Sequence, residues 1–432
     1  MTPSTDYQTA RAPEEQLLLD CARTVVGDTA ISPEAVDADI DWEALLTLSN
    51  RHGTNPLVYR ALAEHCTAPS EQPIASSEQE TSEQETSERD TELVPAWVLD
   101  ELRGVANDTS RRNLRYMNEL LGVLTMLAEE DIRAVPYRGP VLAKQAYGDV
   151  ALRRFGDLDL LVERDEIPRI RSLLKDRGYA PRYWQQSTER LSTAQQRAYT
   201  RYCRDYPFFN EEKGVEIELH WRVVSVHFPT SLTLDSFWDR TERAEIAGRE
   251  IPVLSVEDRV LMICVHGSRH HWERLEWLVD LAAVQHQSEI DWAAVARRAR
   301  RHNCRRMVAL GPLLTHELFD IPIPDPVEGL LREDAGMDDI YGTTVEQLFD
   351  PDFPQNFATQ RIQSRMMERR RDRARFWWRW LTTPDRPDIE RLALPSSVSY
   401  CYPLVRMLRL CYLAVARVSG RRTAPGSDPD LR

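Results

Sequence analysis

The chain has 432 residues, and its 55 Lys and Arg against 69 Asp and Glu give a formal net charge of −14. This length is enough for two or three domains. The acidic charge argues against non-specific binding of the whole protein to nucleic acid or to an anionic membrane. No uncharged apolar stretch reaches the length of about 18 residues that a transmembrane helix needs, so none is predicted.

The seven cysteines form no C-x-x-C pair and follow no regular spacing. An odd number of scattered cysteines argues against a disulfide scaffold or a zinc ribbon and favours reduced thiols. The segment from Met1 to Glu14 is polar and has no apolar signal core. We therefore expect a cytoplasmic protein.

An N-terminal helical region, residues 1–66, is expected first. Glu15 to Val26 and Asp41 to His65 carry apolar residues at helical spacing. An acidic low-complexity linker, residues 67–93, follows, in which Ser76 to Glu92 consists almost wholly of Ser, Glu, Gln, Thr and Asp. Such a composition cannot bury an apolar core, so disorder is predicted there, with an acidic docking segment as the alternative.

The predicted core, residues 94–255, begins with an amphipathic helix. Its apolar residues at helical spacing are Leu114, Met117, Leu120, Leu121, Leu124 and Leu127. A short strand, Ile132 to Tyr137, then leads through Arg138-Gly139-Pro140 into a helix that ends near Tyr147. Proline suits the first helical position, and a glycine at the cap allows close backbone approach. The free N–H groups at this helix start are an expected anion site.

The most informative motif is Asp157-Leu158-Asp159, which is followed by three apolar residues that end at Val162. Side chains alternate along a strand, so Asp157 and Asp159 are expected on one face. Two neighbouring carboxylates repel each other, and a hard divalent cation such as Mg²⁺ relieves that repulsion. An isolated Asp-x-Asp is usually a solvated face, but apolar residues on both faces of this strand indicate burial, and buried carboxylates need a partner.

A second strand is expected from Val215 to Trp221. It carries Glu216, Glu218 and His220 on one face. One acid from this strand beside the aspartate pair would complete the three-carboxylate cradle that two-metal nucleotidyl transfer uses. His220 either orients a carboxylate or the acceptor in the same cleft, or it is a structural histidine covered by Trp221.

Other elements are expected around these two strands. Glu166 to Gly178 predicts a helix, and the polar stretch from Gln185 to Arg201 predicts an insertion or a lid. Ala244 to Leu254 predicts a hairpin around Gly248.

A helical domain, residues 256–360, is expected next. Ser255-Val256-Glu257-Asp258 is a capping box that opens a helix ending at His271. Further helices are predicted over Glu276 to Gln285, Trp292 to Arg301 and Met307 to Phe319. His266 and His270 lie one turn apart on the first of these helices, a spacing that can bind zinc. No third ligand is evident, so we favour two other interpretations, a helix that turns these histidines and Arg274 toward the nucleotide, or structural histidines.

The final region, residues 361–432, is rich in arginine and tryptophan and is expected to be helical. Arg361 to Trp380 can bind RNA by charge and stacking, or it can pair with the chain's own acidic surface. Contact with nucleic acid is the less favoured of these two interpretations. Tyr400 to Val418 is apolar with interspersed arginines, and we expect a buried C-terminal helix, with a helix at a membrane interface as the alternative.

Together these motifs resemble the uncharacterised nucleotidyltransferase family, a branch of the DNA polymerase β-type nucleotidyltransferase superfamily. The resemblance rests on Tyr137 to Pro140, Tyr147-Gly148, Arg153, Gly156 to Val162 and Glu218 to Trp221. It also takes in Val265 to Asp280, Asp41 to Leu46 and His52 to Leu57. The similarity therefore spans roughly residues 40–65 and 95–285, with several separate motifs in the same order.

The resemblance implies an α+β protein in which a small mixed β-sheet forms a nucleotidyltransferase core flanked by helical regions at both ends. It implies that Asp157 and Asp159 bind two Mg²⁺ or Mn²⁺ ions and that Glu218 completes the metal site. Arg138, Gly139 and Arg153 would bind the phosphates of the nucleotide. Glu216 is the less favoured third acid, because Glu218 has the family's position relative to the following His-Trp.

Two positions depart from the pattern. The family usually has Lys-Gly where this chain has Arg138-Gly139, and an arginine keeps the charge and can grip a phosphate with two hydrogen bonds. The wider superfamily has Gly-Ser at this turn. Because Pro140 stands in place of the serine, the turn lacks a hydroxyl contact to phosphate.

The expected activity is metal-dependent transfer of a nucleoside monophosphate from an NTP to a hydroxyl acceptor, with release of pyrophosphate. The motifs leave the acceptor and the base of the NTP open. One alternative is a nucleotide-binding or scaffold module without chemistry. Another is a toxin-like nucleotidyltransferase that modifies tRNA or a protein.

Overall fold

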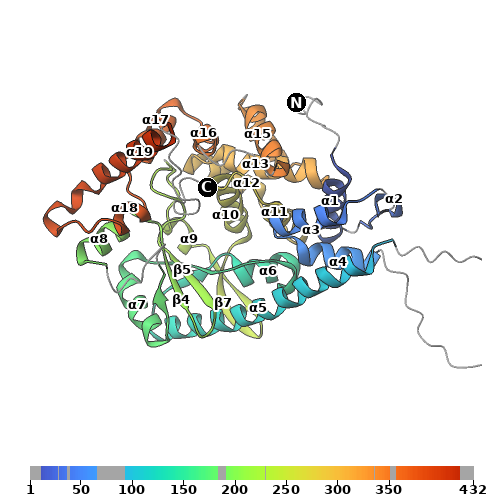
Figure 1. Cartoon of the computed structure of the whole chain (residues 1–432), viewed down its shortest axis with the longest axis horizontal. Coiled ribbons are helices and arrows are strands. Elements are labelled where there is room, and N and C mark those ends of the chain that lie inside the picture. Colours follow the sequence, from blue (N-terminus) through green and yellow to red (C-terminus); the bar gives the residue numbers. More distant parts are fainter. Residues whose placement is uncertain are drawn as a thin grey trace, which may run out of the picture.

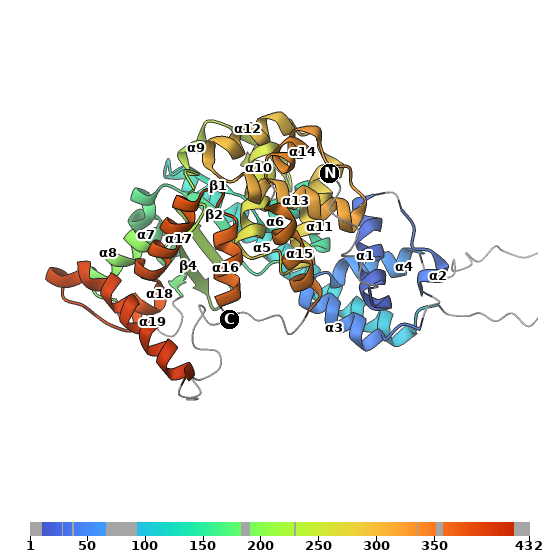
Figure 2. The same cartoon turned by 90° about the horizontal axis from the view of Figure 1, so that it is seen from above.

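A computed structural model of the protein describes residues 11–27, 29–36, 39–65, 93–182, 191–228, 230–334, 336–350 and 357–418. The expected linker lies outside these residues, except for its last position. The architecture is α+β, as predicted, with a small mixed sheet and helices at both ends of the chain. The N-terminal helices and the C-terminal helices lie at opposite ends of the molecule, on either side of the sheet (Figures 1 and 2).

The N-terminal helices are α1 (Pro13–Val26), α2 (Pro33–Val36), α3 (Trp42–His52) and α4 (Asn55–His65). The prediction of one helix from Asp41 to His65 is wrong, because α3 ends at Gly53. This glycine has a φ of 74°, and its N–H bonds the last carbonyls of α3. The sequence signal for this break is the Gly53 C-cap itself, since glycine favours the left-handed conformation.

Helix α5 (Ala96–Glu129) confirms the amphipathic helix predicted after Val94. Its 34 residues run along the lower side of the sheet in Figure 1. The apolar positions that face the core include Met117, Leu120, Leu121, Leu124 and Leu127. Leu114 is the exception, with 59% of its surface exposed.

The main sheet has five strands in the order β1-β2-β5-β4-β3. They are β1 (Ala134–Pro136), β2 (Leu158–Val162), β3 (Ala180–Pro181), β4 (Asp205–Asn210) and β5 (Val215–His220). The central pair β2 and β5 is parallel, and the other pairs are antiparallel. In the parallel pair Asp159 lies opposite Glu218. Both expected acidic strands are therefore present, as neighbours and in register.

Shorter elements surround the sheet. They are α6 (Gly139–Tyr147), η2 (Val150–Leu152), η3 (Arg164–Glu166), α7 (Ile167–Asp176), α8 (Thr193–Tyr202) and α9 (Asp235–Trp238). The predicted hairpin is confirmed as β6 (Thr241–Ile246) and β7 (Arg249–Leu254). The polar stretch expected as an insertion or lid falls partly on α8, and residues 183–190 lie outside the described part of the chain.

The helices after the hairpin cover the other side of the sheet from α5 (Figure 1). They are α10 (Val256–Arg269), α11 (Leu275–Gln287), α12 (Trp292–His302), α13 (Arg305–Phe319), α14 (Asp325–Arg332) and α15 (Met337–Phe349). As predicted, Ser255 caps α10, because its hydroxyl accepts a hydrogen bond of 3.3 Å from the Asp258 N–H.

The C-terminal region consists of α16 (Phe357–Arg365), α17 (Arg370–Thr382), α18 (Arg386–Glu390), η5 (Ser396–Cys401) and α19 (Tyr402–Val418). Only one face of α19 is buried, against α17 and α18, so the expectation of a buried helix holds for that face alone. The residues exposed on the other face, and just before it, are Tyr400, Leu404, Leu408, Tyr412 and Val415. None of the helices in the described ranges has the length and apolar character needed to cross a bilayer.

The close packing of Trp272 on Gly267, in the last turn of α10, makes a prediction about stability. A Cβ at Gly267 would lie 2.5 Å from ring atoms of the fully buried Trp272. We expect Gly267→Ala to lower the free energy of unfolding by about 1–3 kcal/mol through overpacking. The matched control is Gly104→Ala in α5, where a Cβ would meet nothing within 4 Å. That change should stabilise the helix by roughly 0.5–1 kcal/mol. Equal thermal midpoints for the two variants would contradict the packing argument.

Candidate active site

The first component of the site is the turn between β1 and α6. Gly139 has a φ of 58°, and a Cβ there would lie 3.1 Å from the backbone oxygen of Asp157. Both the conformation and the close approach therefore favour glycine. Pro140 occupies the first turn of α6, and no side chain caps this helix end. The N–H groups of the first turn have no partner within the helix, so they can bind an anion.

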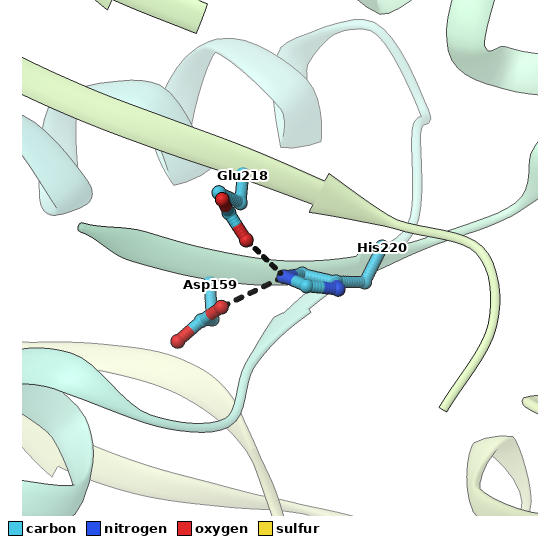
Figure 3. Close-up of side chains that lie close together, drawn as sticks. All are labelled: Asp159, Glu218 and His220. Atoms are coloured by element: carbon cyan, nitrogen blue, oxygen red, sulfur yellow. Dashed lines mark hydrogen bonds and ion pairs between the residues drawn. The ribbon is translucent and has the colours of Figure 1, made fainter. Parts of the chain in front are cut away.

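The second component comes from the parallel strands. On β5 the side chains of Val215, Ile217 and Leu219 are fully buried, and the alternate positions Glu218 and His220 point to the other face. Register then brings Asp159 of β2 beside Glu218. Figure 3 shows His220 Nε2 between the two carboxylates, 2.7 Å from Asp159 Oδ1 and 3.2 Å from Glu218 Oε2.

These three side chains have the spacing of a metal-binding group. Each offers one ligand atom, and the three atoms lie within 4.8 Å of one another. Within the described ranges no other set of three His, Cys, Asp or Glu residues meets this criterion. In addition, Asp159 Oδ2 is buried and accepts no hydrogen bond from the described residues, although Arg138 Nη1 lies 3.3 Å away.

Mutual charge stabilisation sets the protonation of this group. Burial alone would lower the pKa of His220, but its hydrogen bonds to Asp159 and Glu218 outweigh that effect and raise the pKa to about 9. Burial alone would raise the pKa of Asp159, but the charges of Arg138 and His220 hold it below its ordinary value. At neutral pH the pair is therefore an imidazolium beside a carboxylate, and the imidazolium supplies positive charge between two acids.

Asp157 lies immediately before β2 and is half-buried. Burial, followed by repulsion from Asp159, raises the pKa of Asp157 to about 7. The repulsion expected between these two carboxylates is thus present. A nearby divalent cation favours the ionised form of both groups.

Two cavities border the acids. The smaller, of about 360 Å³, is lined by Arg138, Gly139 and Asp157. Its lining also includes Arg112, Arg153, Arg154 and Arg274. The larger, of about 930 Å³, is lined by Glu218 together with the end of α10 and residues of α16 to α19. The acidic group therefore has one cavity on its Asp157 side and another on its Glu218 side.

Arg153, which was expected to bind phosphate, is held in a buried ion pair. Its Nε and Nη2 lie 2.8 and 2.9 Å from the carboxylate oxygens of Asp280 on α11. Both side chains are buried, at 4% and 2% exposure, and Tyr147 also donates a hydrogen bond of 2.8 Å to Asp280. Arg153 thus links the loop before β2 to α11 as well as lining the smaller cavity.

The two histidines of α10 stack on each other and on a tryptophan. The ring centroids of His266 and His270 are 4.6 Å apart, and both rings contact Trp277. Burial and nearby arginines lower the pKa of both histidines, so they are neutral. His270 lines the larger cavity and Arg274 the smaller one, whereas His266 lines neither.

Sequence reasoning missed several residues of the site. Arg112 and Arg154 line the smaller cavity. Each lies among other charged residues in the sequence, so nothing in the sequence distinguished it from its neighbours. Asp280 belongs to the family motif, but its partner is 127 residues away in the chain. Asp205, Arg204 and Arg386 lie beside His220 and Glu218, and only the folded chain brings α18 to this position.

Comparison with known proteins identifies the family of the chain. The sequence model of a family described as "Uncharacterised nucleotidyltransferase" matches residues 38–320, more than half of the chain. The chain belongs to this family. The match contains the turn at Gly139, both acidic strands and helices α10 to α13. No curated protein and no solved structure matches the chain.

The buried ion pair between Arg153 and Asp280 makes a prediction. Asp280→Asn leaves an uncompensated buried guanidinium, so we expect it to cost about 3–5 kcal/mol of unfolding free energy. The double variant Arg153→Met/Asp280→Leu removes both charges and should recover most of that loss. Chemical denaturation measures both. A double variant less stable than the single one would contradict the charge argument.

The raised pKa of His220 predicts how the stability of the metal-free protein depends on pH. The folded state holds this proton more tightly than the unfolded chain, whose pKa is near 6.5. The resulting stabilisation is fully present below pH 6.5 and is lost as the pH rises through about 9. With a chelator present, the thermal midpoint should fall across this window in the wild type and fall less in His220→Gln. If the thermal midpoints of the two proteins depended on pH in the same way, the assigned role of the His220 proton would be refuted.

Proposed function

We propose that this protein is a metal-dependent nucleotidyltransferase that moves a nucleoside monophosphate from an NTP to a hydroxyl acceptor and releases pyrophosphate. The observation that carries the proposal is the pairing of Asp159 with Glu218 on adjacent parallel strands, close to an uncapped, glycine-led helix start. A carboxylate group beside an anion-binding turn matches the needs of phosphoryl chemistry, in which positioning and charge neutralisation provide most of the rate enhancement.

The donor atoms fit a hard divalent cation, Mg²⁺ or Mn²⁺. Asp157, Asp159 and Glu218 would hold it, because they offer carboxylate oxygens and Asp159 Oδ2 is buried without a hydrogen bond from the described residues. Such an ion, when bound, supplies positive charge that activates the acceptor hydroxyl and stabilises the leaving pyrophosphate. The imidazolium of His220 holds the two carboxylates in place and partly neutralises their charge.

In this proposal the smaller cavity binds the triphosphate. Arg138 and Gly139, at the start of α6, line this cavity, and Arg138 Nη1 also lies 3.3 Å from Asp159 Oδ2. Arg112 adds a second guanidinium, whose buried Nε and Nη2 have no hydrogen-bond partner among the described residues. Arg153 is assigned a positioning role on the phosphate side, because its charge is already paired with Asp280.

Glu218 is proposed to receive the proton of the attacking hydroxyl. The acceptor oxygen forms a bond to the α-phosphorus, and the bond from that phosphorus to the bridging oxygen of pyrophosphate breaks. Glu218 fits this role because its carboxylate is half-buried and borders both the metal group and the larger cavity.

We also propose a cytoplasmic location, because the six described cysteines are free thiols.

Substitution of single carboxylates tests the proposal. Transfer of label from α-labelled NTPs, with Mg²⁺ or Mn²⁺ and a lysate as the acceptor source, should fall about 10²–10⁴-fold in Glu218→Gln and at least as much in Asp159→Asn. The matched control is Glu216→Gln, which lies on the same strand face but is paired with Arg182 at 2.8 Å and should retain activity. Equal labelling by all variants, with metal-dependent NTP binding intact, would leave a binding or scaffold module instead.

A further inference from the structure

The larger cavity lies on the Glu218 side of the acids, and a region outside the family match builds much of it. Its walls are the start of β4, the end of α10, and residues of the C-terminal helices such as Gln363, Trp380 and Arg386. Gln363 ties α16 to α10 by donating a hydrogen bond of 2.8 Å to the backbone oxygen of Arg269. The cavity is therefore a defined feature of the fold, formed between the catalytic sheet and the C-terminal region.

Arg269 is the unusual side chain of this cavity. It is buried, with 8% of its surface exposed, and it lines the cavity. No carboxylate from the described part of the chain lies within ion-pair distance of its guanidinium, which hydrogen-bonds Nε2 of the neutral His270 at 2.5 Å. Burial, followed by repulsion from Arg204, lowers the pKa of Arg269 to about 9. A buried cation without a carboxylate at ion-pair distance is costly, so the site favours an anion from outside the chain.

Two further arginines stand beside Arg269 and share a single counter-ion. Asp205 receives both Arg204, at 2.9 Å, and Arg386 of α18. Three guanidinium groups thus face one carboxylate at this end of the cavity. Arg269 is thus the guanidinium of this group without a carboxylate of its own, and arginine matches phosphate oxygens with two parallel hydrogen bonds.

The other charged groups of the lining are committed elsewhere. Glu218 belongs to the metal group, and Asp385 caps α18 by accepting a hydrogen bond from the N–H of Arg386. The charge of Glu273 acts on Arg51 of the N-terminal helices. Arg406 lies near Asp388, which is buried outside the cavity lining. Among the arginines of this lining, Arg269 is therefore the one without a carboxylate at ion-pair distance in the described part of the chain.

We propose that the larger cavity is the acceptor site and that Arg269, with Arg204 and Arg386, binds a phosphate group carried by a small hydroxyl acceptor. This assignment rests on the proposed nucleotidyl transfer. The geometry gives the acceptor two fixed points, with its phosphate on the arginines and its hydroxyl near Glu218. A volume of about 930 Å³ holds a compound of sugar-phosphate size or somewhat larger. The net charge of −14 disfavours a polyanion such as RNA.

Inorganic phosphate is the probe that tests the site without requiring activity. Its affinity for the full-length protein is measured by calorimetry at constant ionic strength in the wild type, Arg269→Met, Arg269→Lys and Arg138→Gln. The matched control is Arg259→Met, because Arg259 is also a buried arginine of α10 but does not line the cavity. We expect Arg269→Met to weaken binding by about tenfold or more, Arg269→Lys to weaken it less, and the other two to leave this site within about twofold.

Unchanged phosphate affinity in Arg269→Met, or loss only in Arg138→Gln, would overturn the assignment. The thermal midpoint of Arg269→Met should not fall, because the change removes an unpaired buried charge. A large fall together with intact phosphate binding would make Arg269 a structural residue. A 5′-phosphorylated RNA oligonucleotide that binds through Arg269 more tightly than glycerol 3-phosphate would overturn the small-molecule assignment.

A failure of the acceptor-site proposal can be told apart from a failure of the nucleotidyltransferase proposal by measuring NTP binding as well. Metal-dependent binding of a non-hydrolysable NTP depends on Asp157, Asp159 and Arg138, and Arg269→Met should leave it within about twofold, because the two cavities share no lining residue. Phosphate bound through Arg269 without NTP binding in the wild type would refute the transfer reaction but leave an anion site. NTP binding without phosphate binding would refute only the acceptor site.

Discussion

The parallel pairing of β2 with β5 is the constraint on which the rest of the site depends. It places Asp159 opposite Glu218 and leaves room for His220 between them. A shift of one residue in this register would turn the acids to the opposite face. The buried apolar residues of both strands, among them Leu160, Ile217 and Leu219, fix that register, because a shift would expose them to water. Core packing and chemistry are therefore set by the same strand pair.

The walls of the two cavities come from different parts of the chain, one inside the family match and the other partly beyond it. The smaller cavity is built within the matched family region, from the turn at Gly139 and the loop before β2. The larger cavity takes much of its wall from residues 360–406, beyond the end of the match at residue 320. A common nucleotide side and a separate C-terminal wall would allow the acceptor to vary while the transfer chemistry stays the same.

Local patterns predicted the parts of the site that depend on local rules. Strand alternation placed Glu216, Glu218 and His220 on one face, and the family resemblance selected Glu218 among the acids. The glycine-proline turn predicted the start of α6, because it depends on neighbouring residues only. Parallel pairing with Asp159 in register was not predictable in the same way, since it depends on contacts far apart in the sequence. The Arg153 pair with Asp280 and the approach of Arg386 to Asp205 arise from such contacts too, across 127 and 181 residues. Gly53 was a sequence signal for the end of α3. It was overlooked because apolar residues continue at helical spacing on both sides of it.

The central claim is that the three carboxylates and the α6 turn form one metal–nucleotide site. A crystal structure with Mn²⁺ and a non-hydrolysable NTP analogue tests it most directly, because anomalous scattering locates the metal. The account predicts Mn²⁺ bound to Asp159, with Asp157 and Glu218 as further ligands, and the triphosphate against the N–H groups at the start of α6. A triphosphate bound instead at Arg269 in the larger cavity, or Mn²⁺ located away from these acids, would contradict it.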